Sequence, residues 1–238
     1  MKTVFFDLDG TLLPMDQDAF VKGYFGLLAA KMKPYGYDPQ TLSKSIWKGV
    51  EAMVRGDGSR LNEETFWDCF SSIYGEGIRK DIPLFEEFYA NEFQQAKIYT
   101  EADPKAAELI AWLRGRGIRP VLATNPVFPQ IATYSRIRWA GLSPDDFQLV
   151  TTYENTHSGK PNPLYYLEIL NTLGLEAKDC IMVGNDAYED MTAEKLGFSV
   201  FLLTNCLINT KGADIDQWPH GGFDELKAFL ERELAEQP

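Results

Sequence analysis

The feature that most constrains this chain is a short apolar run near its beginning that ends in two aspartates. Residues 4–6 are apolar and β-prone, and Gly10-Thr11 predicts a tight turn directly after Asp7 and Asp9. Open α/β folds bind ligands outside the carboxyl ends of their parallel strands, so we expect both acids there, on one side of an extended chain. Two like charges held together need a cation or a shared proton, and hard oxygen ligands favour Mg²⁺. The alternative is a solvated loop that carries two acids.

Length and charge limit the kind of partner that the chain can have. Its 238 residues suffice for one large domain, or for a core with a smaller second domain, at about 150 residues per domain. With 23 basic and 35 acidic side chains the formal charge is −12, which argues against nucleic acid as a partner but not against a small phosphorylated substrate. The three cysteines form no CxxC pair, so neither a zinc site nor a disulfide framework is indicated. The sequence has no recognisable signal segment and no apolar stretch near the ~20 residues of a membrane helix, so we expect a cytoplasmic protein without membrane contact.

The hydrophobic periodicity divides the chain into two kinds of structure. Apolar residues at helical spacing predict four helices, near residues 16–33, 42–54, 62–74 and 83–94, which can pack as a bundle. From residue 103 onward helices alternate with strands, which are predicted at residues 118–123, 147–152, 180–183 and 199–203. Such alternation indicates a parallel sheet covered on both faces. We therefore predict an α/β core of residues 1–14 and 100–238, interrupted by an all-helical insertion of residues 15–99.

Four polar clusters follow predicted strands or precede a helix of the core, and together they carry a resemblance. Each is weak alone, but their order is specific: Asp7-Leu8-Asp9-Gly10-Thr11-Leu12, then Thr124-Asn125, then Gly159-Lys160-Pro161, then Gly184-Asn185-Asp186 with Asp190. The set resembles the motifs of the haloacid dehalogenase-like superfamily, in its phosphoglycolate phosphatase-like subgroup. The resemblance covers residues 1–14 and about 100–205, and the helical insertion matches the family's all-helical C1-type cap in position and class only. It implies a Rossmann-like parallel sheet core with an inserted helical cap domain.

The resemblance also implies a chemistry, that of a magnesium-dependent phosphatase (a phosphoric monoester hydrolase) acting through an aspartyl-phosphate. Asp7 would be the nucleophile, and Asp9 the acid that protonates the leaving oxygen and then the base that activates water. The Asp7 side chain, the Asp9 backbone carbonyl and Asp186 would bind Mg²⁺, with water and a substrate oxygen completing the shell. Lys160 would place a positive charge beside Asp7 and the phosphoryl group, and Thr124 and the Asn125 amide would bind phosphate oxygens. The substrate would be a small phosphorylated metabolite such as phosphoglycolate, a sugar phosphate or a nucleotide.

Several of these residues have simpler interpretations. Asn125 could be only the N-cap of the next helix, and Lys160 could be an exposed loop lysine. Asp190, about one helical turn beyond Asp186, could orient Lys160 instead of contacting metal. Asn185 stands where many relatives carry an acid; we prefer Asp186 as the metal ligand because a carboxylate outcompetes an amide for Mg²⁺.

Substrate selection is expected to lie in the insertion. Lys48, Arg55 and Arg60 are candidate contacts there, although each is typical of a solvated surface. We interpret the tryptophans Trp47, Trp67 and Trp112 as core residues, and His157 and His220 as structural or surface residues.

Three other functions are compatible with parts of the pattern. A sugar phosphomutase of the same superfamily would carry a histidine soon after the first motif, and no histidine precedes His157. A dehalogenase of the superfamily would lack an acid at Asp9, because a halide leaves without a proton. A non-catalytic protein that binds phosphorylated metabolites would be expected to have lost one of the four clusters. The sequence leaves the oligomeric state open.

Overall fold

The computed structural model describes residues 2–235 and contains a six-stranded parallel sheet with the strand order β3-β2-β1-β4-β5-β6. The strands are β1 (Thr3–Phe6), β2 (Val121–Leu122), β3 (Leu149–Val150), β4 (Cys180–Gly184), β5 (Ser199–Leu203) and β6 (His220–Gly221). The order reverses between β1 and β4, which is where open α/β sheets form their ligand crevice. The predicted α/β class with a parallel sheet is confirmed.

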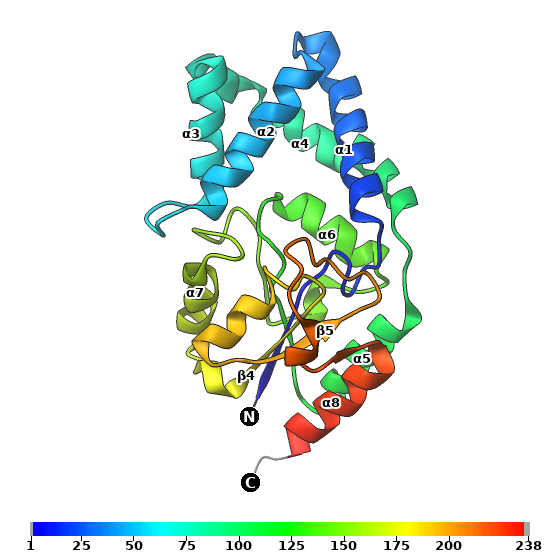
Figure 1. The fold of residues 1–238 in the computed structure, drawn as a ribbon. Coiled ribbons are helices and arrows are strands. Elements are labelled where there is room, and N and C mark those ends of the chain that lie inside the picture. Colours follow the sequence, from blue (N-terminus) through cyan, green and yellow to red (C-terminus); the bar gives the residue numbers. More distant parts are fainter. Residues whose placement is uncertain (1, 236–238) are drawn as a thin grey trace.

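Alternate residues of the central strands are buried in different layers. Phe6 of β1 belongs to the hydrophobic cluster that includes Leu109 of α5 (Pro104–Arg114) and Leu226 of α8 (Phe223–Ala235). Phe5 belongs to the opposite cluster, with Tyr165 of α7 (Pro163–Leu173). Helices therefore cover both faces of the sheet (Figure 1), as the near-continuous apolar strands require.

The segment between β1 and α5 is helical. It comprises α1 (Gln17–Met32), α2 (Pro39–Val54), α3 (Asn62–Tyr74) and α4 (Ile82–Ala90), followed by a 3₁₀ segment, Glu92–Tyr99, that leads back to the core. These helices form a layer above the carboxyl edge of the sheet, with α6 (Gln130–Trp139) beneath them (Figure 1). The two connections run side by side: Met15 and Thr100 form an antiparallel bridge, and the Glu101 N–H donates to the Pro14 carbonyl at 3.0 Å.

Some sequence-based boundaries differ from the structure. The fourth helix ends at Ala90 instead of continuing to residue 94, and β6 was not predicted, because two residues carry no detectable alternation. Between the strands at residues 180–183 and 199–203, where the alternation of helices and strands predicts a helix, the structure has only a 3₁₀ segment, Met191–Leu196. Further 3₁₀ turns are Lys33–Tyr35, Glu76–Asp81, Pro144–Asp146, Ala177–Asp179 and Ile215–Gln217. Across residues 2–235, no helix combines the length and apolarity that crossing a membrane would require.

Candidate active site

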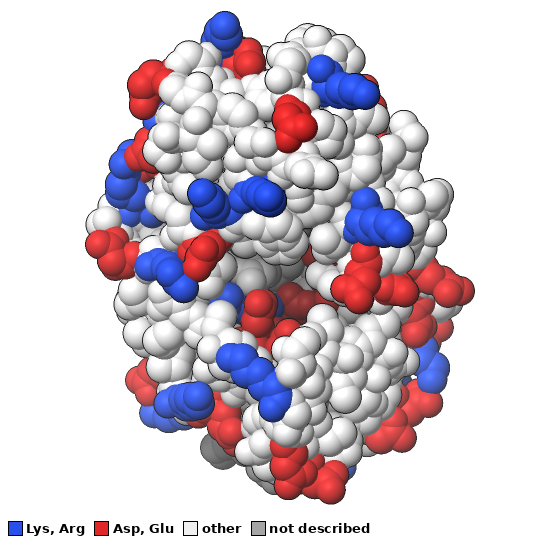
Figure 2. Space-filling view, turned by 45° about the horizontal axis from the view of Figure 1, so that its top comes forward, with Lys and Arg blue, Asp and Glu red and all other residues white. Residues whose placement is uncertain are grey.

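A cavity of about 330 Å³ lies between the carboxyl edge of the sheet and the helical layer. Figure 2 shows this face of the molecule as a hollow with acidic side chains inside it. Helices α1 to α4 line one side of the cavity, and the ends of β1, β2 and β4 line the other. All of the site residues predicted from the sequence line it: Asp7, Asp9, Thr124, Asn125, Lys160, Asn185, Asp186 and Asp190. The fold therefore brings four clusters that are far apart in sequence into one cavity.

Lys160 is buried between two carboxylates at the floor of this cavity. Its Nζ donates to Asp7 Oδ1 at 2.7 Å and to Asp190 Oδ1 at 2.6 Å, and the side chain is 2% exposed. Burial alone would lower the pKa of Lys160, but the two carboxylates outweigh it and hold the pKa well above its usual range. The interpretation of Lys160 as an exposed loop residue is therefore wrong, and Lys160 is a fixed positive charge beside Asp7.

A glycine makes this arrangement possible. A Cβ at Gly184, the last residue of β4, would overlap the Asp190 side chain. Asp190 Oδ2 also accepts from the Asp186 N–H at 2.9 Å, which closes the turn after the strand. Asp190 thus lies against the end of β4 with one oxygen on the backbone and the other on Lys160.

Asp9 is paired with an arginine that was not among the predicted site residues. Arg136 of α6 is fully buried, and its guanidinium contacts Asp9 Oδ2 and lies 4.3 Å from the centre of the Phe128 ring. Burial raises the pKa of Asp9 above its ordinary value, against the lowering effect of Arg136. A carboxyl group with a raised pKa suits proton donation to a leaving group.

The turn after Asp9 is attached to the β4 loop. Gly10 has a φ of 83°, and its Cα faces Asn185 so closely that a side chain would collide with the amide. Thr11 Oγ1 donates to Asn185 Oδ1 at 2.9 Å, and Asn185 Nδ2 donates to the Cys206 carbonyl at 2.7 Å. Asn185 therefore joins three loops. Asp186, by contrast, is only partly buried: its Oδ1 accepts from the Tyr188 and Glu189 N–H groups, and its Oδ2 is free.

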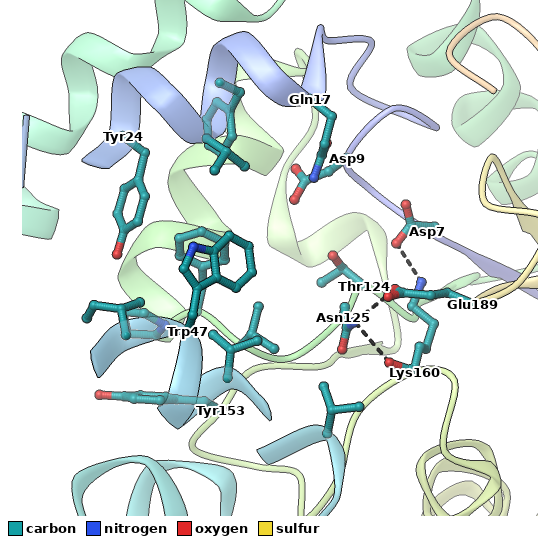
Figure 3. A pocket seen from close by; sticks show the side chains of 18 of the residues that line it. Asp7, Asp9, Gln17, Tyr24, Trp47, Thr124, Asn125, Tyr153, Lys160 and Glu189 are labelled. Atoms are coloured by element: carbon teal, nitrogen blue, oxygen red, sulfur yellow. Dashed lines mark hydrogen bonds and ion pairs between the residues drawn. The ribbon is translucent and has the colours of Figure 1, made fainter. Parts of the chain in front are cut away.

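Asn125 makes side-chain contacts within the cavity wall (Figure 3). Its Nδ2 donates to the Lys160 carbonyl at 3.2 Å and to Glu189 Oε2 at 2.9 Å. Burial raises the pKa of Glu189 to about 7. Helix α6 begins at Gln130 after the N-cap Pro129, so the interpretation of Asn125 as an N-cap is wrong. Thr124 is 2% exposed, and its carbonyl accepts from Thr151 and Tyr165.

The donor atoms at the acidic end of the cavity suit a hard cation. Asp7 and Asp186 offer carboxylate oxygens, and Asn185 offers an amide oxygen. Neither histidine nor cysteine is among the described residues that line the cavity. Within residues 2–235, no group of three or more His, Cys, Asp or Glu side chains converges as a ready metal cage. Mg²⁺ is commonly held by one or two carboxylates, water and substrate phosphate, so these residues fit magnesium and not zinc.

The structure changes the interpretation of several residues of the helical layer. Lys48, Arg55 and Arg60 do not line the cavity; Arg55 pairs with Glu51 at 2.8 Å and Arg60 pairs with Asp68. Trp47 is not a core residue: it is 50% exposed and lines the cavity. His157 lies outside the cavity lining and pairs with Glu168.

Arg136 and Glu189 were missed because nothing local in the sequence distinguishes them. Arg136 carries the same charge as Arg138, two residues later, which is exposed, and a charged residue in a helix is ordinarily assigned to the solvent face. Glu189 is one acid in an acidic turn. Only their burial against Asp9 and Asn125 reveals that they belong to the site.

Comparison with known proteins agrees with this geometry. The family model described as haloacid dehalogenase-like hydrolase matches residues 1–197. The chain is 25% identical over 201 residues to a phosphoglycolate phosphatase of Nitrosospira multiformis, covering 84% of this chain and 82% of that protein. It is 26% identical over 222 residues to a phosphoserine phosphatase of Thermus thermophilus, covering 82% and 85%.

Among solved structures, a 2-haloacid dehalogenase from Pseudomonas syringae pv. Tomato superposes with a TM-score of 0.61 at 19% identity, over 98% of this chain and 99% of that chain. A likeness at this identity concerns the fold alone. The chain belongs to the haloacid dehalogenase-like hydrolase family, among its phosphoric monoester hydrolases.

Proposed function

We propose that this phosphatase hydrolyses a small phosphate monoester with the help of Mg²⁺, through an aspartyl-phosphate formed on Asp7. The observation that carries the proposal is the buried contact of Lys160 Nζ with Asp7 Oδ1 at 2.7 Å, in a cavity that Asp9 also lines. Lys160 fixes the Asp7 carboxylate and adds positive charge where a phosphoryl group would approach. Phosphoglycolate and phosphoserine are the substrates for which two of the relatives are named.

The proposed reaction has two steps. A carboxylate oxygen of Asp7 attacks phosphorus, the bond from phosphorus to the ester oxygen breaks, and Asp9 gives its proton to that oxygen as the alcohol leaves. Asp9 then takes a proton from water, the water oxygen attacks the aspartyl-phosphate, and inorganic phosphate leaves as the Asp7 carboxylate re-forms. The raised pKa of Asp9 supports the first proton transfer. Arg136 is proposed to hold the Asp9 side chain in place.

Two groups are proposed to bind the phosphate oxygens. Thr124 lines the cavity, and its hydroxyl is proposed as one of them. The side-chain N–H groups of Asn125 already donate to Lys160 and Glu189, so the backbone N–H of Asn125 is proposed as the other. Asp7, the Asp9 carbonyl and Asp186 are proposed to bind Mg²⁺, which would neutralise charge on the phosphoryl oxygens. Asn185 and Asp190 would support these groups by holding the Thr11 turn and Lys160.

Residues 15–99 are proposed to act as a cap domain over the core formed by residues 1–14 and 100–238. Side chains of α1, α2, α3 and α4 line the cavity opposite the aspartates, which supports a role in enclosing the substrate. The connections near Pro14 and Glu101 would be the hinges, since they are the two places where the chain passes between the parts.

The proposal is tested by magnesium-dependent release of phosphate from p-nitrophenyl phosphate. Asp7→Asn should abolish turnover while far-ultraviolet circular dichroism and the urea midpoint remain close to wild type, because the amide keeps the shape but is not a nucleophile. Rapid quenching in acid during turnover of ³²P-labelled substrate should leave label on the wild-type protein and not on Asp7→Asn.

Asp18→Asn is the matched control, because it removes an acidic charge from the first turn of α1 without touching the cavity lining. It should leave turnover unchanged. Substantial hydrolysis by folded Asp7→Asn, or turnover by the wild type that is unaffected by a chelator, would contradict the proposal.

A further inference from the structure

The cavity has two chemically different ends (Figure 3). Asp7, Asp9, Thr124, Lys160 and Glu189 gather at one end, while Tyr24, Trp47 and Tyr153 lie on the other side of the space. Further aromatic rings line the cavity, contributed mainly by the helical layer: Phe20, Phe25, Phe66, Trp67, Phe85 and Phe128. If the phosphoryl group lies at the polar end, the alcohol portion of the substrate lies among aromatic and aliphatic side chains.

This second end offers no cation to a substrate. Among the described residues that line the cavity, Lys160 is the only lysine or arginine, and Asp7 and Asp190 already engage it. Arg136 does not supply one, because it is fully buried against the Phe128 ring and paired with Asp9. Glu86 is the charged residue that α4 contributes to the lining. A carboxylate on the alcohol portion would therefore lose hydration without gaining a cationic partner, and Glu86 would add a like charge.

From this lining we propose that the enzyme selects phosphate monoesters whose alcohol portion is uncharged and apolar, preferably a planar ring, and rejects those whose alcohol portion carries a carboxylate. The inference rests on the proposed function and specifies its substrate class. It separates this chain from relatives named for phosphoglycolate and phosphoserine, both of which carry a carboxylate. The cavity volume of about 330 Å³ also exceeds what a two-carbon alcohol portion needs and falls within the ~300–1,000 Å³ of ordinary ligand pockets.

Trp47 is the residue that we expect to contact the substrate ring. It projects from α2 into the cavity, is 50% exposed, and its ring centre lies 5.8 Å from that of Phe25. A large aromatic side chain left half exposed beside an acidic site is available to cover an incoming ring, and aromatic pairs prefer offset or edge-to-face contacts at such distances. Because half of its surface is exposed, its removal disturbs packing less than removal of a buried tryptophan such as Trp67 would.

The test uses alkyl phosphates, so that differences in leaving-group acidity do not decide the rates. The substrates are ethyl phosphate, 2-phenylethyl phosphate, 2-(4-carboxyphenyl)ethyl phosphate, its neutral 4-carbamoyl analogue, phosphoglycolate and phosphocholine, each assayed for kcat/KM with Mg²⁺. We expect kcat/KM for 2-phenylethyl phosphate to exceed that for ethyl phosphate by at least about tenfold. About tenfold is the smallest discrimination usually found for a single methylene in a hydrophobic pocket. The carboxyphenyl ester should be at least about tenfold poorer than its carbamoyl analogue, which differs little in size but carries no charge.

Two variants connect the selectivity to the lining. Trp47→Ala should lower kcat/KM for 2-phenylethyl phosphate more than for ethyl phosphate, and so reduce the preference for the aromatic ester. Trp47→Lys should in addition raise kcat/KM for phosphoglycolate and for the carboxyphenyl ester, because it supplies the missing cation. Tyr35→Ala is the matched control: Tyr35 is 58% exposed, also belongs to the helical layer, and does not line the cavity. Tyr35→Ala should leave the ratios of kcat/KM between these substrates unchanged.

The outcomes separate this inference from the proposed function. Hydrolysis of none of these esters and none of p-nitrophenyl phosphate would overturn the proposed function itself. Hydrolysis in which phosphoglycolate matches or exceeds 2-phenylethyl phosphate would leave the phosphatase intact and overturn the selectivity. A preference for phosphocholine over 2-phenylethyl phosphate would also overturn it, since the aromatic rings would then serve a cationic group.

Discussion

Replacing Lys160 by methionine tests whether its buried ion pairs hold the site together. Lys160 Nζ lies 2.7 Å from Asp7 Oδ1 and 2.6 Å from Asp190 Oδ1, and all three side chains are less than 10% exposed. Methionine fills similar space but leaves two carboxylates uncompensated and close together. Removing one partner of a buried pair costs about 3–5 kcal/mol, and with two carboxylates stranded we expect the upper half of that range. This is a large share of a typical 5–15 kcal/mol of unfolding free energy.

The free energy of unfolding would be measured by urea titration with chelator present, following intrinsic tryptophan fluorescence and circular dichroism. The m-value should remain unchanged, so that the shift in midpoint reports stability. Lys105→Met is the matched control. Lys105 Nζ also lies 2.7 Å from a carboxylate, that of Asp224, and the substitution changes the net charge by the same amount. The two partners of this pair, however, are about half exposed or more. It should leave the midpoint close to wild type, because exposed ion pairs contribute little.

A double-mutant cycle with Asp190→Asn sharpens the prediction. The asparagine keeps an oxygen for Lys160 but removes one charge, so Lys160→Met should cost less in the Asp190→Asn background, with a coupling of about 0.5–3 kcal/mol. Equal midpoints for Lys160→Met and Lys105→Met, or additive effects in the cycle, would refute the claim that burial of the ion pairs decides their energetic role.

Three further predictions concern the reaction and its metal. Asp9→Asn should slow turnover of alkyl phosphates by roughly a hundred- to ten-thousand-fold, and should slow turnover of nitrophenyl phosphate less. Equal losses for both substrates would refute a role in leaving-group protonation. Asp186→Ala should raise the Mg²⁺ concentration for half activity more than Asn185→Ala does; a larger shift for Asn185→Ala would move the metal contact back by one residue. Gly184→Ala should displace Asp190, lower the free energy of unfolding by about 1–3 kcal/mol and reduce turnover, and an unaffected variant would show that this close approach is dispensable.

The sequence predicted the elements whose signals are local. Residues 199–203 were predicted as a strand and form β5, because a continuous apolar run of only a few residues is typical of a buried strand. The first, second and third helices were predicted near their true bounds for the same reason, since their apolar residues repeat at helical spacing. The two-residue strands β2 and β3 lie inside longer predicted strands, and β6 was missed. Pairing with a neighbouring strand defines each of the three, and their own composition does not.

The candidate site shows the same difference between local sequence signals and features that depend on distant neighbours. The sequence by itself indicated which residues could do chemistry, because the order of the four polar clusters along the chain can be read without the fold. Tertiary structure decided the environment: that Lys160 is buried on two carboxylates, that Arg136 holds Asp9, and that Trp47 faces a cavity. Charge state, hydration and substrate fit depend on neighbours brought from far along the chain. Those neighbours exist only once the sheet is formed and the helical layer lies over its edge.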